Sequence, residues 1–296
     1  MVSIDSEVNN IRALCYTTLV RTLSNLLIAV GPKNGNLTEI YFTTPEAGFY
    51  HIPYEQEKVF DRMMPIAGSH YALENSLNTD LPRYLWTPSA VVEQIKQYGK
   101  ELDNLGVLPT PFPLREVLDE NALQQLFKIY GITGLSYGNL SAREIVPELG
   151  PSSFWMTARG VNKAKLTTVG KDILLVKGFD DEAGIALVSV PPEYEPKARV
   201  SVDAVEHELI YRSYPEVGAV VHVHAWMDDI LCTRQNYPCG TRELAVEVAD
   251  LLKQTGRPSR TVVGLKNHGL TITGPSLEDI FDRIRGKLKI EVPMYN

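Results

Sequence analysis

The sequence of 296 residues has few cysteines and no long hydrophobic run, and each absence excludes a class of protein. The three cysteines, Cys15, Cys232 and Cys239, are too few and too widely spaced for a disulfide framework or a CxxC metal knuckle, so we expect reduced thiols. Apolar stretches such as residues 26–30 are far shorter than a membrane span. The N-terminus lacks the basic start and apolar run of a signal peptide, which predicts a cytoplasmic protein with no membrane partner.

The sequence has no excess of positive charge, because 36 acidic residues outnumber 29 lysines and arginines and give a formal net charge of -7. A protein that binds nucleic acid needs a basic face, so we expect no nucleic-acid partner. Hydrophobic residues make up 44% of the chain and charged residues 22%, which is typical of a folded globular protein.

Two regions of the chain differ in character, and the proline-rich residues 109–113 form a stiff candidate linker between them. Residues 1–110 carry strand-like runs and one helical pattern, which predicts an N-terminal α+β region of unknown role. Residues 111–296 alternate helices and strands, which predicts an α/β domain with helices covering a sheet. We expect strands at 25–30, 39–43, 49–52, 154–157, 172–177, 217–224, 261–265 and 270–272, and helices at 90–105, 114–130, 202–213, 241–254 and 277–290.

The strongest chemical signal is a pair of histidines in an apolar strand, His222 and His224. Residues two apart in a strand point to the same side, so both imidazoles share one face while Val221 and Val223 point into a core. A third histidine, His268, stands before a glycine at a turn between two apolar strands. Three neutral imidazoles can hold one divalent ion, and zinc is the expected one.

A carboxylate at the start of an expected helix is the acid/base candidate. Ser201 is the expected N-cap, and Asp203 lies in the first turn, where the helix dipole favours an anion. Asp203 has three possible roles: a structural acid, a general base beside the metal, or a fourth ligand. His207 lies one turn later, and we interpret it as a buried structural histidine.

A loop rich in glycine and serine, residues 134–141, can form a nest of backbone N–H groups for an anion. Arg159, followed by Gly160 at the end of a strand, adds a planar cation that suits a phosphate or a carboxylate.

The order of these features resembles the class II aldolase/adducin family. The resemblance covers about residues 117–296 and rests on an ordered set of motifs: Gly-Asn-Leu-Ser at 138–141, Thr157-x-x-Gly160, the acid four residues before His207, His222-x-His224, and Asn267-His268-Gly269. It implies a three-layer α/β/α sandwich with the N-terminal α+β region added, and a homo-oligomer, most often a tetramer, with sites between subunits. It also implies a divalent metal on His222, His224 and His268, and an anion site at Ser136, Gly138, Asn139, Gly160 and Ser201, to which Arg159 is added.

The sequence departs from the family pattern at four places. Asp203 stands where the aldolases have a glutamate and the epimerases an aspartate. Arg159 and Val202 replace small hydroxyl residues, which leaves the identity of the bound anion open. The segment from His224 to Gly240 is shorter than usual, and residues 1–110 are extra.

Three functions follow from the resemblance. The first is a metal-dependent lyase of aldolase type, which acts on a small hydroxy-ketone bearing phosphate or carboxylate through a metal-stabilised enediolate. The second is a sugar-phosphate 4-epimerase or dehydratase of the same family. The third is a non-catalytic, adducin-like interaction protein, against which the presence of all three histidines argues.

Overall fold

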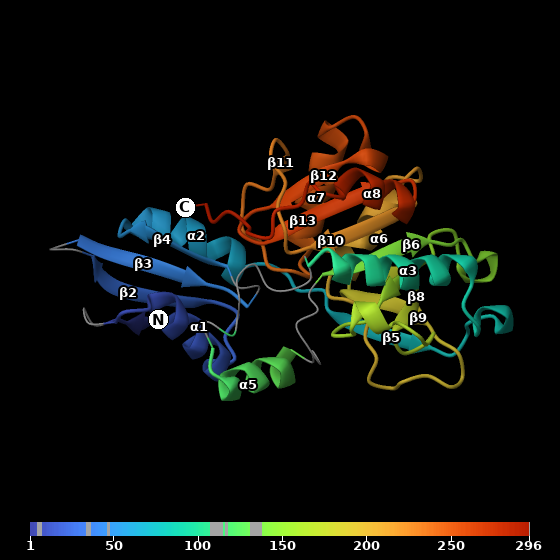
Figure 1. Cartoon of the computed structure of the whole chain (residues 1–296), viewed down its shortest axis with the longest axis horizontal. Coiled ribbons are helices and arrows are strands. Elements are labelled where there is room, and N and C mark those ends of the chain that lie inside the picture. The colour runs from blue at the N-terminus through green and yellow to red at the C-terminus, as the bar shows by residue number, and fades with distance from the viewer. Residues whose placement is uncertain are drawn as a thin grey trace.

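The chain forms two sheets, each covered by helices on both faces. The computed structural model describes residues 1–4, 8–33, 37–45, 48–106, 115, 118–130 and 138–295. Figure 1 shows the smaller, N-terminal sheet beside the larger one. No helix in the described ranges is both long and apolar enough to cross a membrane.

The smaller sheet has the strand order β1-β2-β3-β4, with β1 parallel to β2 and the other pairs antiparallel. Helices α1 and α5 pack on one face through the cluster around Tyr16, Leu19 and Leu123, and α2 packs on the other face against Ile40 and Ile52. The elements are β1 (Val2–Ser3), α1 (Ile11–Thr22), β2 (Leu27–Lys33), β3 (Leu37–Thr43), β4 (Phe49–Pro53), α2 (Gln56–Ala67) and α5 (Glu120–Tyr130).

The larger sheet has nine strands in the order β11-β12-β13-β10-β6-β7-β8-β9-β5. Most pairs are antiparallel, whereas β5 pairs with β9 and β11 with β12 in parallel. The strands are β5 (Glu74–Asn78), β6 (Asn139–Arg143), β7 (Phe154–Thr157), β8 (Ile173–Asp180), β9 (Ile185–Ser189), β10 (Ala219–Val223), β11 (Leu231–Cys232), β12 (Val262–Leu265) and β13 (Gly269–Gly274).

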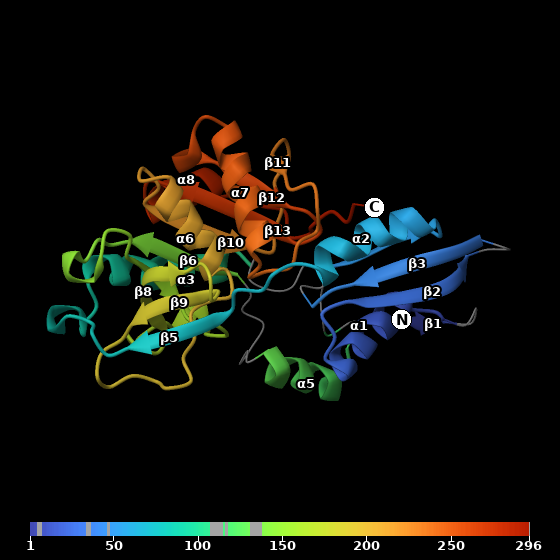
Figure 2. The same ribbon diagram turned by 180° about the vertical axis from the view of Figure 1, so that it is seen from behind.

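Four helices cover this sheet, two on each face. Helices α3 (Ala90–Asn104) and α8 (Leu277–Ile284) share a core with Val221 and Val223 of β10. Helices α6 (Ala204–Ser213) and α7 (Arg242–Gln254) share the opposite core with Val220. Figure 2 shows α6 and α7 on this second side. The predicted three-layer α/β/α sandwich is therefore confirmed. Short 3-10 helices complete the fold at Arg83–Leu85, Pro147–Leu149, Lys163–Lys165 and Pro258–Arg260.

The two sheets do not follow the expected division of the chain at residue 110. Strand β5 and helix α3 precede that position but belong to the larger sheet and its core. Helix α5 follows it but packs against α1. The candidate linker at 109–113 lies outside the described residues, as do residues 114, 116 and 117 of the helix expected over 114–130, so the division into independent units stays a prediction.

Several elements differ from the expected ones. Strand β10 and helix α8 are shorter than the ranges 217–224 and 277–290. Helices α1 and α2 and strands β1, β5, β6, β9 and β11 were not predicted, and β6 contains residues 139–141 of the expected glycine-rich loop. Helix α1 is rich in β-branched residues, which weakens its own helical preference, so packing of its buried face stabilises it.

Gly218, which leads into β10, gives a test of how closely the sheet is packed. A Cβ at this position would lie 2.0 Å from the carbonyl oxygen of Pro275, so Gly218→Ala forces two backbones apart. We expect the free energy of unfolding to fall by about 1–3 kcal/mol or more. Urea unfolding measures the change.

The control is Gly178→Ala in β8, where the nearest atom, Leu187 Cδ1, lies 3.8 Å from the added Cβ. This variant should change stability by no more than about 1 kcal/mol. Equal effects of the two substitutions would contradict the close approach at Gly218.

Candidate functional site

The three predicted histidines lie together at one end of β10. Their ring centroids are 5.2 Å apart for His222 and His224, 4.8 Å for His222 and His268, and 4.9 Å for His224 and His268. The Nε2 atoms of His224 and His268 are 3.2 Å apart, and all three side chains are buried. The structure therefore brings the three histidines together, and their role as metal ligands stays a prediction.

The strand pairing fixes where these imidazoles lie. His222 stands opposite Asn139 of β6 and Thr271 of β13. At the turn before β13 the left-handed residue is Asn267, with φ 58°, rather than the expected Gly269. Gly269 serves close packing instead, because a Cβ there would lie 2.2 Å from the carbonyl oxygen of Val223.

The side chain of Asn267 also ties the chain's C-terminal segment to this turn. Its Oδ1 accepts a hydrogen bond from the backbone N–H of Tyr295 at 2.7 Å, and its Nδ2 donates to the carbonyl of Tyr295 at 3.0 Å. The residue that positions His268 is therefore also the anchor of residues near the end of the chain.

Hydrogen bonding and burial leave the imidazoles ready to act as ligands. His222 Nδ1 lies 3.0 Å from the carbonyl oxygen of Leu270, so this nitrogen carries the proton and donates it. Its Nε2 then holds a lone pair, and this buried atom has no hydrogen-bond partner. Burial lowers the pKa of His222, His224 and His268, which keeps the rings neutral.

Cys239 joins this cluster, which the sequence analysis did not foresee. Its Sγ lies 3.1 Å from Nε2 of His268, and ligand atoms of His222, Cys239 and His268 all lie within 4.8 Å of one another. The shortness of the segment between His224 and Gly240 was the available signal, since it returns the chain quickly toward the histidines.

The separation of His224 and His268 suits a single metal ion, whereas the set of ligand atoms that all lie within 4.8 Å of one another joins Cys239, and not His224, to His222 and His268. Two nitrogen ligands about 2.0–2.1 Å from a tetrahedral zinc lie roughly 3.3 Å apart. The 3.2 Å between the Nε2 atoms of His224 and His268 is close to that value. In the described part of the chain no carboxylate belongs to the gathered set.

Asp203 is buried beside the cluster and is the N-cap of α6, a position expected for Ser201. Its Oδ2 accepts a hydrogen bond of 2.6 Å from Nδ2 of Asn139. Its negative charge raises the pKa of His222, Arg159 and Lys163, in each case against the larger effect of burial. Asp203 is therefore the local centre of negative charge.

Lys163 is a second residue that sequence reasoning missed. Its side chain is buried, with 3% of the residue exposed, and burial lowers its pKa to about 7. Its 3-10 helix packs tightly on α3, where a Cβ at Gly99 would lie 2.6 Å from the carbonyl oxygen of Lys163. The sequence feature that could have indicated Lys163 is its position three residues after Gly160, the last residue of the Thr-x-x-Gly motif.

A polar network continues from Asp203 along α6. Thr271 donates a hydrogen bond of 2.6 Å to Oε1 of Glu206. His207 Nδ1 and the hydroxyl of Tyr211 each lie 2.8 Å from the hydroxyl of Ser141. His207 lies outside the ligand cluster, in agreement with its interpretation as a structural residue.

Asn139 and Arg159, two of the residues expected to bind an anion, both interact with Asp203. Asn139 holds this carboxylate from one side, next to Gly138, which has φ 78° and packs its Cα against the carbonyl of His222. Arg159 and Gly160 line a separate pocket of about 420 Å³ that also contains Lys165, Lys171 and Lys197. Ser201 adjoins them through its backbone N–H, which lies 3.3 Å from the carbonyl of Thr157, and Ser136 lies outside the described residues.

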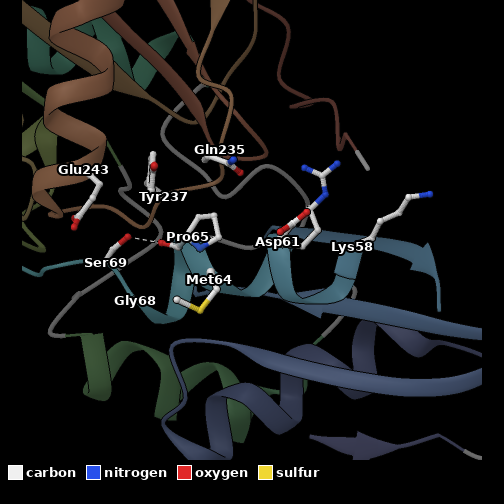
Figure 3. A pocket seen from close by; sticks show the side chains of 10 residues that line it. Lys58, Asp61, Met64, Pro65, Gly68, Ser69, Gln235, Tyr237 and Glu243 are labelled. Carbon is white, nitrogen blue, oxygen red and sulfur yellow. Dashed lines mark hydrogen bonds between the residues drawn. The ribbon is translucent and has the colours of Figure 1, made fainter. Parts of the chain in front are cut away.

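A larger hollow of about 700 Å³ lies between α2 and the segment that leads into α7 (Figure 3). Lys58, Asp61 and Met64 line it from α2, and Gln235 and Tyr237 from the segment. None of the predicted site residues lines this hollow.

The free energy of unfolding should depend on pH through the buried carboxyl group of Glu206. Burial, then the charge of Asp203, raises the pKa of Glu206 to about 8, whereas the hydrogen bond from Thr271 acts the other way. The folded state therefore retains a proton that the unfolded chain releases near pH 4.5, so this group's stabilising effect is present at low pH and is lost as pH rises toward 8. Between these values the free energy of unfolding should fall by about 1.4 kcal/mol per pH unit.

Glu206→Gln removes this titration and keeps Oε1 as an acceptor. We expect the stability of the variant, relative to the wild type, to rise between about pH 5 and about pH 8, as measured by urea unfolding across that range. A difference that stays constant with pH would show that Glu206 does not titrate in this way.

Comparison with known proteins gives one family. Residues 121–232 match the class II aldolase and adducin N-terminal domain. Methylthioribulose-1-phosphate dehydratase of Leptospira biflexa serovar Patoc is 28% identical over 137 residues, 44% of this chain and 58% of that relative. A protein of the same name from Leptospira interrogans serogroup Icterohaemorrhagiae is 32% identical over 117 residues, 38% of this chain and 42% of that relative. The matches thus span less than two thirds of either relative.

Among solved structures, L-fuculose 1-phosphate aldolase superposes with a TM-score of 0.44 at 19% identity, over 67% of this chain and 82% of that one. An aldolase II superfamily protein from Pseudomonas syringae gives 0.42 at 20% identity, over 69% and 74%. The matched segment includes Asp203, His222 and His224, so the part of the chain that contains these predicted site residues is similar to the class II aldolase and adducin N-terminal domain.

Proposed function

We propose that this protein is a metal-dependent lyase that acts on a small hydroxy-ketone bearing a phosphate or carboxylate. The observation that carries the proposal is the convergence of three buried, neutral imidazoles beside the buried carboxylate of Asp203. A structural role alone does not require three histidines and an acid to lie together in a core, since each costs free energy to bury.

His222, His224 and His268 would hold the ion, and zinc fits their nitrogen donors and spacing. The donor set passes a simple test of fit, because Nε2 of His222 is buried, unprotonated and without a hydrogen-bond partner. When bound, the ion supplies Lewis-acid chemistry, which stabilises negative charge on neighbouring oxygens of a substrate.

Asp203 is proposed as the base that removes a proton next to the substrate's carbonyl group. Its Oδ2 is held by Asn139, which orients the carboxylate, and it is not one of the gathered ligands. A carboxylate that stands off the histidines, rather than binding the ion as a fourth ligand, can accept a proton from carbon.

Cationic side chains near Asp203 are proposed to bind the substrate's anionic group. Arg159 is half-buried; its Nη2 donates a hydrogen bond of 3.3 Å to the carbonyl of Leu73, and its buried Nε has no hydrogen-bond partner. The proposed anion site consists of Arg159 with Gly138, Asn139, Gly160 and Ser201; Ser136, which the family resemblance adds, lies outside the described residues. The buried amine of Lys163, whose pKa burial lowers to about 7, interacts electrostatically with Asp203 and with His222.

Dehydration is the form of lyase reaction that the similar curated proteins favour, since both carry the name methylthioribulose-1-phosphate dehydratase. Aldol cleavage and 4-epimerisation of a ketose phosphate remain the alternatives. Incubation with ketose 1-phosphates and product analysis by NMR distinguishes loss of water from carbon–carbon cleavage. A failure to convert any such substrate would favour an adducin-like role.

The proposal also includes a cytoplasmic homo-oligomer, most simply a tetramer, as the family resemblance implies. Light scattering should give a mass of about four chains. A monomer at micromolar concentration would contradict this part of the proposal and leave the chemistry of the site unaffected.

Two substitutions separate the base from the ligands. Asp203→Asn keeps the shape of the side chain and removes its basicity, so turnover should fall by about 10²–10⁴-fold while metal content stays constant. His268→Ala should lose both the metal and the activity. Metal analysis of the purified variants, beside steady-state rates, makes the distinction, and loss of metal from Asp203→Asn would identify Asp203 as a ligand instead.

A further inference from the structure

We propose that Cys239 is a fourth ligand of the metal, so that the ion has three nitrogen donors and one sulfur donor in the absence of substrate. This inference rests on the proposed metal site. It adds a residue that lies outside the matched family segment, residues 121–232.

The thiol of Cys239 lies close to two of the three histidines. Sγ of Cys239 lies 3.1 Å from Nε2 of His268 and within 4.8 Å of the ligand atom of His222. Nitrogen and sulfur donors of one tetrahedral zinc lie roughly 3.5 Å apart, from bond lengths of about 2.0–2.1 and 2.3 Å. The thiol is therefore already near the place that a ligand would take.

The imidazole of His268 has two neighbouring polar atoms at hydrogen-bonding distance from the same nitrogen. Its Nε2 faces both Nε2 of His224, at 3.2 Å, and Sγ of Cys239, at 3.1 Å. One imidazole nitrogen has either one proton or one lone pair, so it cannot form two strong hydrogen bonds along different directions. The buried Nε2 of His222 has no such bond at all. A single cation between these atoms would satisfy every lone pair at once.

Hydrogen bonds hold the backbone on both sides of Cys239. Thr241 Oγ1 donates a hydrogen bond of 2.8 Å to the carbonyl of Pro238, and the N–H of Ala72 donates one of 2.8 Å to the carbonyl of Gly240. Figure 3 shows the same segment running past Gln235 and Tyr237 toward Glu243 of α7. Cys239 is thus held in place by packing and is not at the tip of a free loop.

Ligation also fits the chemistry of the two partners. A thiol loses its proton when it binds zinc, and that proton goes to solvent. Cys239 is half-buried, whereas the three histidines are buried, so it is the member of the set that solvent can reach. A site with four protein ligands is closed, so substrate must displace the thiolate or enlarge the coordination sphere.

The test uses the full chain loaded with Co²⁺, because a thiolate bound to cobalt gives a charge-transfer band in the near ultraviolet. The wild type should show this band. Cys239→Ser should lose the band while binding cobalt, and should release zinc to a chelator at least about tenfold more readily. The matched control is Cys232→Ser, since Cys232 lies in β11 and is not part of the cluster.

The possible results distinguish ligation by Cys239 from the metal site on which it depends. Cobalt bound by the wild type without the band, or a band that persists in Cys239→Ser, overturns the role of Cys239 and leaves the histidine site standing. Absence of any bound metal in the wild type overturns both.

Discussion

The pairing of β10 with β13 on one side and β6 on the other is the constraint on which the site depends. It places His222 between Asn139 and Thr271, and each of these neighbours then fixes a carboxylate: Asn139 holds Asp203, and Thr271 holds Glu206. Val221 and Val223 bury the opposite side of the strand against α3 and α8. A change in register by one residue would exchange these faces and remove the histidines from the site.

Burial and the carboxylate of Asp203 act in opposite directions on the basic groups around this strand. Burial lowers the pKa values of Lys163, Arg159 and the three histidines, whereas Asp203 raises those of Lys163, Arg159 and His222 by a smaller amount. Burying such groups costs stability unless they are paired or bind a ligand. The arrangement is therefore consistent with a core that gives up some stability to hold an ion and an anionic molecule.

Features that depend on local spacing could be predicted from the sequence. The shared face of His222 and His224 follows from the two-residue period of a strand, and the layered fold follows from alternating patterns and the family resemblance. The position of Cys239 could not be predicted, because it depends on a contact between Gly240 and Ala72, which are distant in sequence. The packing of residues 74–104 with the larger sheet could not be predicted either, since the pairing of β5 with β9 is equally long-range.

The double hydrogen bond between Asn267 and Tyr295 couples two segments that lie 28 residues apart in the sequence. Because Asn267 directly precedes His268, the position of this imidazole depends on the segment around Tyr295 as well as on β13. A substitution of Asn267 would therefore act on His268 in two ways, through the left-handed turn and through the loss of both hydrogen bonds.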